Sequence, residues 1–153
     1  MTEGSSVSSP APLACRGIRG ATTVTANTSE EILEATTDLI VAMVHLNDLQ
    51  TEEIASAIFT TTTDLTATFP ALAAREMGWT EVPLLCTHEM EVPGALGHVV
   101  RILLHVNTVR TAAEVRHVYL RGAHALRPDW GLSEAELASL PKRRGVASGV
   151  AAS

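Results

Sequence analysis

The sequence predicts an α/β (α+β) fold, in which helices pack against a mixed β-sheet, for three reasons. Residues 28–45 repeat apolar side chains with the period of an α-helix. Residues 98–108 alternate apolar and polar side chains, as a half-buried strand does. Residues 15–24 form a short segment that tolerates β-structure and is marked by glycines. Because such segments interleave along the chain, we expect about five strands and two to three helices in one layered domain.

The chain is predicted to begin with a tail that leads into a strand. Residues 1–14 are rich in Ser, Pro and Ala without any periodicity, which is typical of a disordered segment. Residues 15–24, with Gly17 and Gly20, are predicted to be the first strand. Glycine weakens a strand interior, so these two positions indicate a bulge or the close approach of another group.

The clearest helix follows this strand. Thr28 and Glu31 have the spacing of a capping box, in which each side chain accepts from a free backbone N–H of the first turn. We expect the helix to run to about His45 and to end before the polar pair Asn47-Asp48. Its apolar face is predicted to consist of Ile32, Leu33, Ala35, Thr36, Leu39, Ile40, Met43 and Val44.

The next segment, residues 53–62, is ambiguous between helix and strand. Thr51 and the acidic pair after it resemble a helix start, but β-prone apolar residues and a run of four threonines favour a strand. We therefore predict a strand. Residues 70–77 are predicted to form a short helix, since Pro70 stands in its first turn and Gly78 lies just past its end.

Three more strands are predicted in the second half of the chain, at residues 82–90, 98–108 and 117–126. A helical turn is expected at residues 111–115, and Arg127-Pro128-Asp129 ends the last strand. In the strand at 98–108, one face carries Val100, Ile102, Leu104 and Val106, and the other carries Arg101, Leu103, His105 and Asn107.

The chain is predicted to end in a flexible tail, residues 131–153, which is rich in Gly, Ser and Ala near its end. Ser133 and Glu136 have the spacing to cap one more short helix within it. The domain itself is therefore expected to span residues 15–130.

Net charge and hydropathy limit the class of partner. The chain has 153 residues and a formal net charge of −6, so neither nucleic acid nor an anionic membrane is expected as the main partner. A small anionic ligand remains compatible, because it responds to the local field of a pocket. No apolar run approaches membrane-spanning length, and the N-terminus lacks the pattern of a signal peptide.

Cysteine, histidine and aromatic content carry further expectations. Cys15 and Cys86 form neither a metal-ligand spacing nor a disulfide framework, which favours a reducing cytoplasm. The six histidines never form a tight ligand cluster, so no metal site is expected. Aromatic residues make up only 3% of the chain, and a core of smaller side chains gains less from burial. Oligomerisation is one way to bury the remaining apolar surface.

Four residues with polar chemistry lie in apolar, strand-like segments: Arg19, Glu89, Arg101 and Tyr119. Charged side chains are rarely buried unless they are paired, so this placement indicates a polar pocket. Two arginines, one glutamate and no evident nucleophile are typical of a site that binds an anion. No Walker loop, GxGxxG sequence or Ser-His-Asp pattern is present.

Each of these residues also has a structural explanation. Arg19 has small neighbours on its strand face, but it could instead pair with an acidic residue of an adjacent strand. Arg101 could be a solvated arginine of an edge strand, and Glu89 a surface carboxylate. Tyr119 could be a core residue with a satisfied hydroxyl. The residues alone predict an anion-binding pocket with one acceptor carboxylate and leave these alternatives open.

Several motifs match a known family in the same order. They are RGIRGATTV at 16–24, RHVYL at 116–120 and LRPD at 126–129, together with shorter matches such as Thr63-Asp64-Leu65, Phe69-Pro70-Ala71, Gly78-Trp79 and Glu89-Met90. In this pattern the sequence resembles the AroH-class chorismate mutases, small trimeric enzymes of aromatic amino-acid biosynthesis. The resemblance covers about residues 15–130.

The resemblance implies a trimeric pseudo-barrel that converts chorismate to prephenate by an intramolecular Claisen rearrangement. This reaction needs no nucleophile, cofactor, metal or proton transfer. Catalysis would come from holding the compact conformer of the substrate and from donors that stabilise developing charge. The active sites would lie at subunit interfaces, and the expected partners are the dianionic substrate and two further copies of the chain.

The resemblance also implies a role for each site residue. Arg101 would donate to the ether oxygen, Arg19 would bind the enolpyruvyl carboxylate, and Glu89 would accept from the ring hydroxyl. Tyr119 would contact the same carboxylate arm, Cys86 would lie near the hydroxyl end, and Arg127 would help to hold or cover the ligand. The substrate-binding set is Tyr119, Cys86, Phe69, Ala71, Arg75, Arg127 and Leu126, with Phe69, Ala71 and Arg75 coming from the neighbouring subunit.

Two departures qualify the resemblance. Leu72 stands where the family commonly has a lysine, which would raise the Michaelis constant. Strand alternation places Cys86 and Glu89 on opposite faces, so both line one pocket only if a bulge or strand end falls near Thr87-His88. The alternatives considered are a RidA-like trimeric imine hydrolase and a non-catalytic carboxylate-binding protein.

Overall fold

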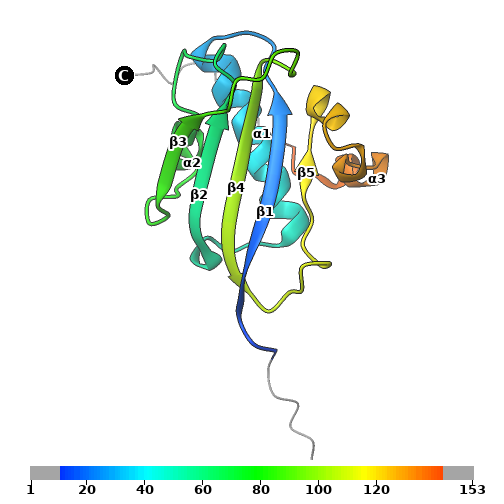
Figure 1. Ribbon diagram of the computed structural model, residues 1–153. Coiled ribbons are helices and arrows are strands. Elements are labelled where there is room, and N and C mark those ends of the chain that lie inside the picture. The colour runs from blue at the N-terminus through cyan, green and yellow to red at the C-terminus, as the bar shows by residue number, and fades with distance from the viewer. Residues whose placement is uncertain (1–10, 143–153) are drawn as a thin grey trace, which may run out of the picture.

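The computed structural model describes residues 11–142 and shows a mixed five-stranded sheet with the strand order β3-β2-β4-β1-β5 (Figure 1). The two pairs that involve β4 are antiparallel, whereas β2–β3 and β1–β5 are parallel. The fold class predicted from the sequence is therefore confirmed. The strands are β1 (Ala14–Thr23), β2 (Ile54–Thr61), β3 (Leu84–His88), β4 (Val99–Thr108) and β5 (Val118–Tyr119).

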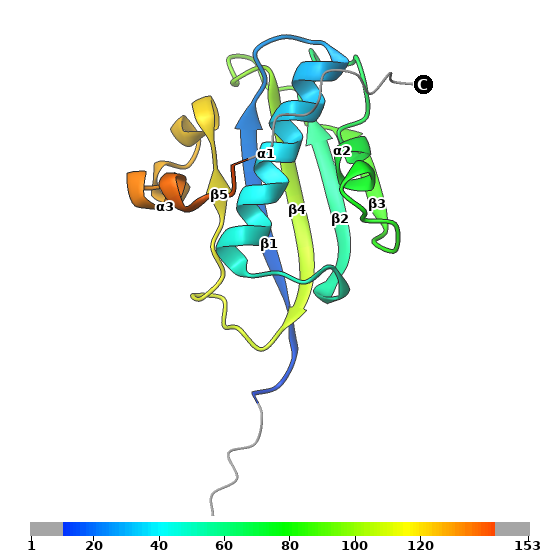
Figure 2. The ribbon, with the colours of Figure 1, turned by 180° about the vertical axis from the view of Figure 1, so that it is seen from behind.

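Helices α1 (Ser29–Asn47) and α2 (Ala71–Glu76) cover one face of this sheet (Figure 2). The third helix, α3 (Glu134–Ser139), lies beyond β5 together with two 3₁₀ helices, η2 (Arg121–Ala125) and η3 (Pro128–Trp130) (Figure 1). Among residues 11–142, no helix covers β3, β2 and β4 on the opposite face of the sheet, which we call the open face (Figure 1). Within residues 11–142 no helix is long and apolar enough to cross a membrane.

The predicted capping box of α1 is only half formed, because the Glu31 carboxylate accepts from the hydroxyl of Thr25 and not from the backbone N–H of Thr28. The hydroxyl of Thr28 accepts a hydrogen bond of 3.2 Å from the backbone N–H of Glu31. The predicted C-terminal end is wrong by two residues, because the helix continues through Asn47. The buried Asn47 amide donates to the carbonyl of Met43 and accepts from the N–H of Arg116, so its polar groups are satisfied inside the fold.

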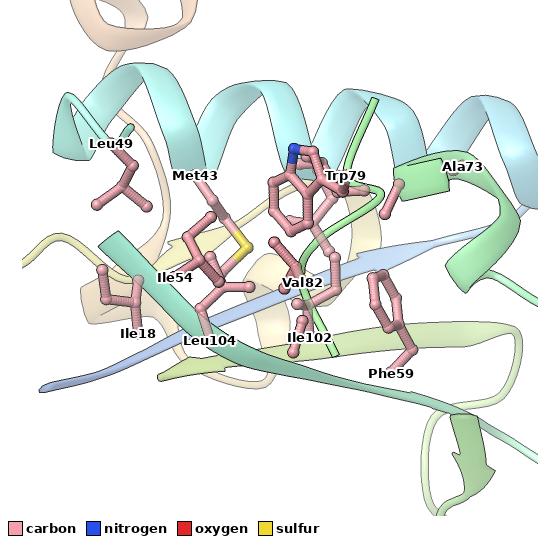
Figure 3. Close-up of a cluster of buried hydrophobic side chains, with 14 of the residues drawn as sticks. Ile18, Met43, Leu49, Ile54, Phe59, Ala73, Trp79, Val82, Ile102 and Leu104 are labelled. Carbon is pink, nitrogen blue, oxygen red and sulfur yellow. The ribbon is translucent and has the colours of Figure 1, made fainter. Parts of the chain in front are cut away.

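The main core lies between α1, α2 and the sheet (Figure 3). The alternation predicted for residues 98–108 is confirmed, since Ile102 and Leu104 of β4 point to the helices with Phe59 of β2. Gly20 of β1 allows close approach of α1, because a Cβ there would overlap the side chain of Met43. Full burial of one such aliphatic side chain contributes about 1.5–3 kcal/mol.

Two predicted strands are longer than the strands in the structure. The strand predicted at 82–90 is only Leu84–His88. The strand predicted at 117–126 is shortened to β5, because residues 121–125 turn into η2. Arg121 adopts a left-handed backbone with φ of 52°, which no strand accommodates. The N–H of Gly122 then donates to the hydroxyl of Thr23, so the turn is bonded back to β1.

The start of the predicted strand at 53–62 is also shifted. Residues 51–53 form a 3₁₀ turn, and β2 begins at Ile54. The predicted turn at 111–115 is present, closed by a bond from the N–H of Glu114 to the carbonyl of Thr111.

Arg116, just before β5, bonds to the C-terminal part of the described chain, which also pairs with β5 through Gly131 and Tyr119. Ser133 and Glu136 form the predicted capping box of α3. The guanidinium of Arg116 binds both carboxylate oxygens of Glu136 at 2.9 Å and donates to the carbonyl of Gly131. Ordered structure therefore continues past residue 130, into the segment predicted as a flexible tail. Residues 1–10 of the predicted N-terminal tail and residues 143–153 lie outside the described residues.

We predict that Arg116→Ala lowers the free energy of unfolding by about 2 kcal/mol, because it removes a charge-assisted bidentate contact. The hydrogen bond from Arg116 lowers the pKa of Glu136 to about 2, from an ordinary 4.5. A lowered folded-state pKa contributes stability that is present above about pH 4.5 and is lost as the pH falls towards 2. Denaturant unfolding should therefore show a difference between the variant and the wild type at pH 7 that shrinks below pH 4.5.

Arg121→Ala is the matched control, because Arg121 makes one 2.9 Å contact with Asp38 away from Glu136. A loss of stability that stays constant between pH 7 and pH 3 would contradict the assignment to Glu136.

Candidate active site

Four side chains form a row across the open face of the sheet. Thr60 of β2 is the register partner of Arg101, Arg101 is the partner of Ala21, and Ala21 is the partner of Tyr119. Register partners on neighbouring strands project to the same face of a sheet. The row therefore brings together residues from distant parts of the sequence, from Ala21 to Tyr119, with the small Ala21 between Arg101 and Tyr119.

Arg101 lies at the centre of this row and is held beside a carboxylate. Its Nε is 3.6 Å from Oε1 of Glu89, and both side chains are about 30% exposed. The hydroxyl of Thr60 donates to the same oxygen of Glu89. The predicted pairing of an arginine with one acceptor carboxylate is therefore present in the geometry. Thr60 is an additional member that the sequence did not single out.

The Nε of Arg101 is an unsatisfied donor. It is buried, and it has no hydrogen-bond acceptor within the described part of the chain. A buried donor without an acceptor costs about 1–3 kcal/mol, so such groups are rare unless a ligand or partner completes them. The nearest carboxylate oxygen, Oε1 of Glu89, lies just beyond hydrogen-bond distance, so the two side chains form an ion pair without a hydrogen bond from this Nε.

Arg19 lies at the β5 side of the same face, against two aromatic rings. Its guanidinium carbon is 5.9 Å from the ring centre of Tyr119 and 5.7 Å from that of Trp130. The two rings meet edge to face at 5.5 Å. Arg19 has no carboxylate salt-bridge partner among residues 11–142, so the alternative that an adjacent strand neutralises it is not observed. Leu126 packs against the buried cluster that contains Tyr119.

The guanidinium of Arg127 lies over the ring of Trp130. Its guanidinium carbon is 3.5 Å from the centre of the indole ring, and it forms two hydrogen bonds of 3.0 and 3.1 Å with Asp129. The bond to Asp129 raises the pKa of Arg127, and the same bond lowers the pKa of Asp129. Arg127 is therefore near the Arg19 group, but it is bound to Asp129 rather than pointing free into a pocket.

A second group of predicted site residues lies at the other edge of the sheet. Phe69 is 74% exposed, and Ala71 begins α2 with its side chain buried. Arg75 is exposed on the last turn of the same helix, and Leu72 is half-buried between them. The structure does not bring this group to Arg101 within one chain.

Cys86 belongs to this second group. It is the register partner of Phe59 and packs against the helix-covered core, so it faces α2. Burial raises the pKa of the Cys86 thiol, and the backbone of Ala71 and the charge of Arg75 oppose that effect. The strand end that would bring Cys86 and Glu89 together is present, because β3 ends at His88. Glu89 nevertheless turns to Thr60 on the open face, so within one chain the two residues do not line the same pocket.

Two functional neighbours of Arg19 were missed from the sequence, His117 and Trp130. His117 is one of the six histidines that form no ligand cluster in the sequence, and Trp130 belongs to no predicted helix or strand. The position of Trp130 directly after the LRPD motif was the available signal. Among residues 11–142, no three His, Cys, Asp or Glu side chains lie together in a way that could hold a metal ion.

Comparison with known proteins decides the family. The family model of chorismate mutase type I matches residues 15–130. The chain belongs to the type I chorismate mutase family. The proteins of this family are isomerases. This assignment does not support the RidA-like alternative.

Relatives and a solved structure agree with this assignment. The protein named chorismate mutase AroH of Thermus thermophilus is 52% identical over 115 residues, covering 74% of this chain and 94% of that protein. The protein of the same name from Bacillus subtilis is 42% identical over 120 residues, with 78% and 94% covered. A chorismate mutase structure from Clostridium thermocellum has a TM-score of 0.71 and 48% identity, covering 72% of this chain and 98% of that chain.

Proposed function

We propose that this chorismate mutase converts chorismate to prephenate on the open face of its sheet, with Arg101 as the principal catalytic residue. The observation that carries the proposal is the buried Nε of Arg101, which lies 3.6 Å from Glu89 and has no hydrogen-bond acceptor among residues 11–142. In the reaction one C–O bond breaks and one C–C bond forms within the same molecule. Negative charge develops on the ether oxygen, and a donor fixed in place stabilises it without reorganisation.

The remaining roles follow from position. Glu89, held by Thr60 beside Arg101, would accept from the ring hydroxyl and favour the electron-poor ring of the transition state. Arg19, whose guanidinium has no carboxylate partner in the described chain, would bind the enolpyruvyl carboxylate beside Tyr119. Together these contacts would select the compact conformer, an orientation effect that accounts for a large part of such catalysis.

We further propose that the protein is a homotrimer in which each active site is shared by two subunits. Two features support this. Leu85 on the open face is 60% exposed and Phe69, just before α2, is 74% exposed, and exposed apolar side chains of this kind mark interfaces. The second group, around Phe69, Ala71 and Arg75, lies too far around the sheet edge to meet Arg101 of its own chain. Cys86 would then enter the site with that group, from the neighbouring subunit.

The test is turnover by the purified protein in the presence of EDTA. We expect chorismate absorbance to fall without any added metal or cofactor, at a rate that EDTA leaves unchanged. The rate should be nearly constant across neutral pH, because no step transfers a proton. Binding of chorismate without turnover would overturn the proposal and favour a carboxylate-binding protein. Two free cysteines, Cys15 and Cys86, are compatible with the cytoplasmic setting that we propose.

A further inference from the structure

His117 connects the backbone of Arg19 to the aromatic cover of the site. Its Nδ1 accepts a hydrogen bond of 3.0 Å from the backbone N–H of Arg19. Its ring lies 4.1 Å from the ring of Trp130, between the strand that carries Arg19 and the segment that carries Arg127. Because β5 begins only at Val118, this side chain bonds a backbone N–H of β1 just beyond the end of the strand pairing.

The hydrogen bond requires a neutral imidazole. Nδ1 accepts only when it carries no proton, so the ring proton must be on Nε2. The charged groups that face the ring are Arg19 of β1, Arg127 and Asp129 beside η3, and the adjacent Arg116. Burial lowers the pKa of His117 most, the three arginines lower it further, and Asp129 opposes them. Geometry and charge therefore agree that the ring is neutral near pH 7.

We propose that His117 is a positioning residue for Arg19, holding the carboxylate-binding guanidinium in place through the backbone bond and the stack on Trp130. This inference depends on the proposed role of Arg19 in binding chorismate. A displacement of about 1 Å in a substrate-holding group can cost about a hundredfold in rate. Protonation of His117 would place a second donor against the Arg19 N–H and a further positive charge among three arginines. At acidic pH, His117 would then no longer hold the guanidinium of Arg19 in place.

Two substitutions separate this role from simple packing. Asn at position 117 keeps a carbonyl oxygen near the place of Nδ1, whereas Leu keeps volume without an acceptor. We expect His117→Leu to lower kcat/KM about ten- to a hundredfold, mainly by raising KM, and His117→Asn to remain within about threefold of wild type. Thermal unfolding of both variants checks the fold. Equal losses in the two variants would overturn the proposal.

A double-mutant cycle tests whether His117 acts through Arg19. If it does, Arg19→Ala combined with His117→Leu should have nearly the same kcat/KM as Arg19→Ala alone. Additive losses would show that His117 acts independently, which overturns the proposal. This outcome is distinct from failure of the proposed function, which would appear as a wild type that does not consume chorismate.

The pH dependence of kcat/KM is a further test. We expect kcat/KM to be constant above the ordinary histidine pKa of 6.5 and to fall in acid with a midpoint below it. In His117→Asn, which has no group titrating there, that fall should disappear. An identical acid limb in wild type and His117→Asn would overturn the proposal.

Discussion

Replacement of Arg101 by alanine is expected to lower kcat for chorismate turnover by about 10²–10³, with a smaller change in KM. The buried Nε of Arg101 lies beside Glu89 and has no hydrogen-bond acceptor in the part of the chain that the structure describes. A donor of this kind stabilises charge that exists only in the transition state, so its loss affects the chemical step more than substrate binding. Steady-state kinetics from the absorbance of chorismate give both parameters.

The matched control is Arg16→Ala, which removes an equal charge from the neighbouring strand. Arg16 is the register partner of Val106, a core residue, so it belongs to the helix-covered face, and its Nε donates to the carbonyl of Arg110. It should retain nearly full activity. Arg101→Lys should recover little, because an ammonium cannot reproduce the planar donor geometry of a guanidinium. An active Arg101→Ala variant would refute the role assigned to this residue.

Local sequence patterns were sufficient for most of the fold. The N-cap at Thr28 and the alternation through Ile102 each depend on residues within a few positions of one another, so single-sequence reasoning found them. Element ends depend on tertiary contacts. Asn47 extends α1 because Arg116, far along the chain, satisfies its amide, and η2 replaces the end of a predicted strand where Gly122 bonds back to Thr23.

Sequence patterns could select the candidate site residues but could not predict how these residues lie relative to one another. Arg19, Glu89 and Arg101 were found because charged residues stand out in apolar strands. Their placement in one row with Tyr119 depends on strand register, which no local pattern contains. Likewise, the position of Cys86 beside α2 follows from its pairing with Phe59. These placements divide the predicted site into two groups on one chain, which is the basis for a shared site.

Loss of Arg75 should also lower kcat/KM by about 10²–10³, if Arg75 is a donor that reaches into the site of the neighbouring subunit. In that arrangement each active site lies at a junction between two subunits. One subunit supplies the half of the site around Arg101, and the next subunit supplies the half around Arg75. A trimer that contains both Arg101→Ala and Arg75→Ala chains then has one junction at which the active site retains both Arg101 and Arg75. Two different inactive variants should therefore restore activity when they assemble together.

The most direct measurement is the activity of mixed trimers, isolated after coexpression of the two variants with different affinity tags. We expect Arg101→Ala with Arg75→Ala to recover about one third of wild-type activity, since one junction in three is intact in a closed ring. Mixed trimers of Arg101→Ala with Arg19→Ala, whose substitutions lie in the same half, should stay inactive. If the first mixture is as inactive as the second, each site is built within a single chain and the account is contradicted.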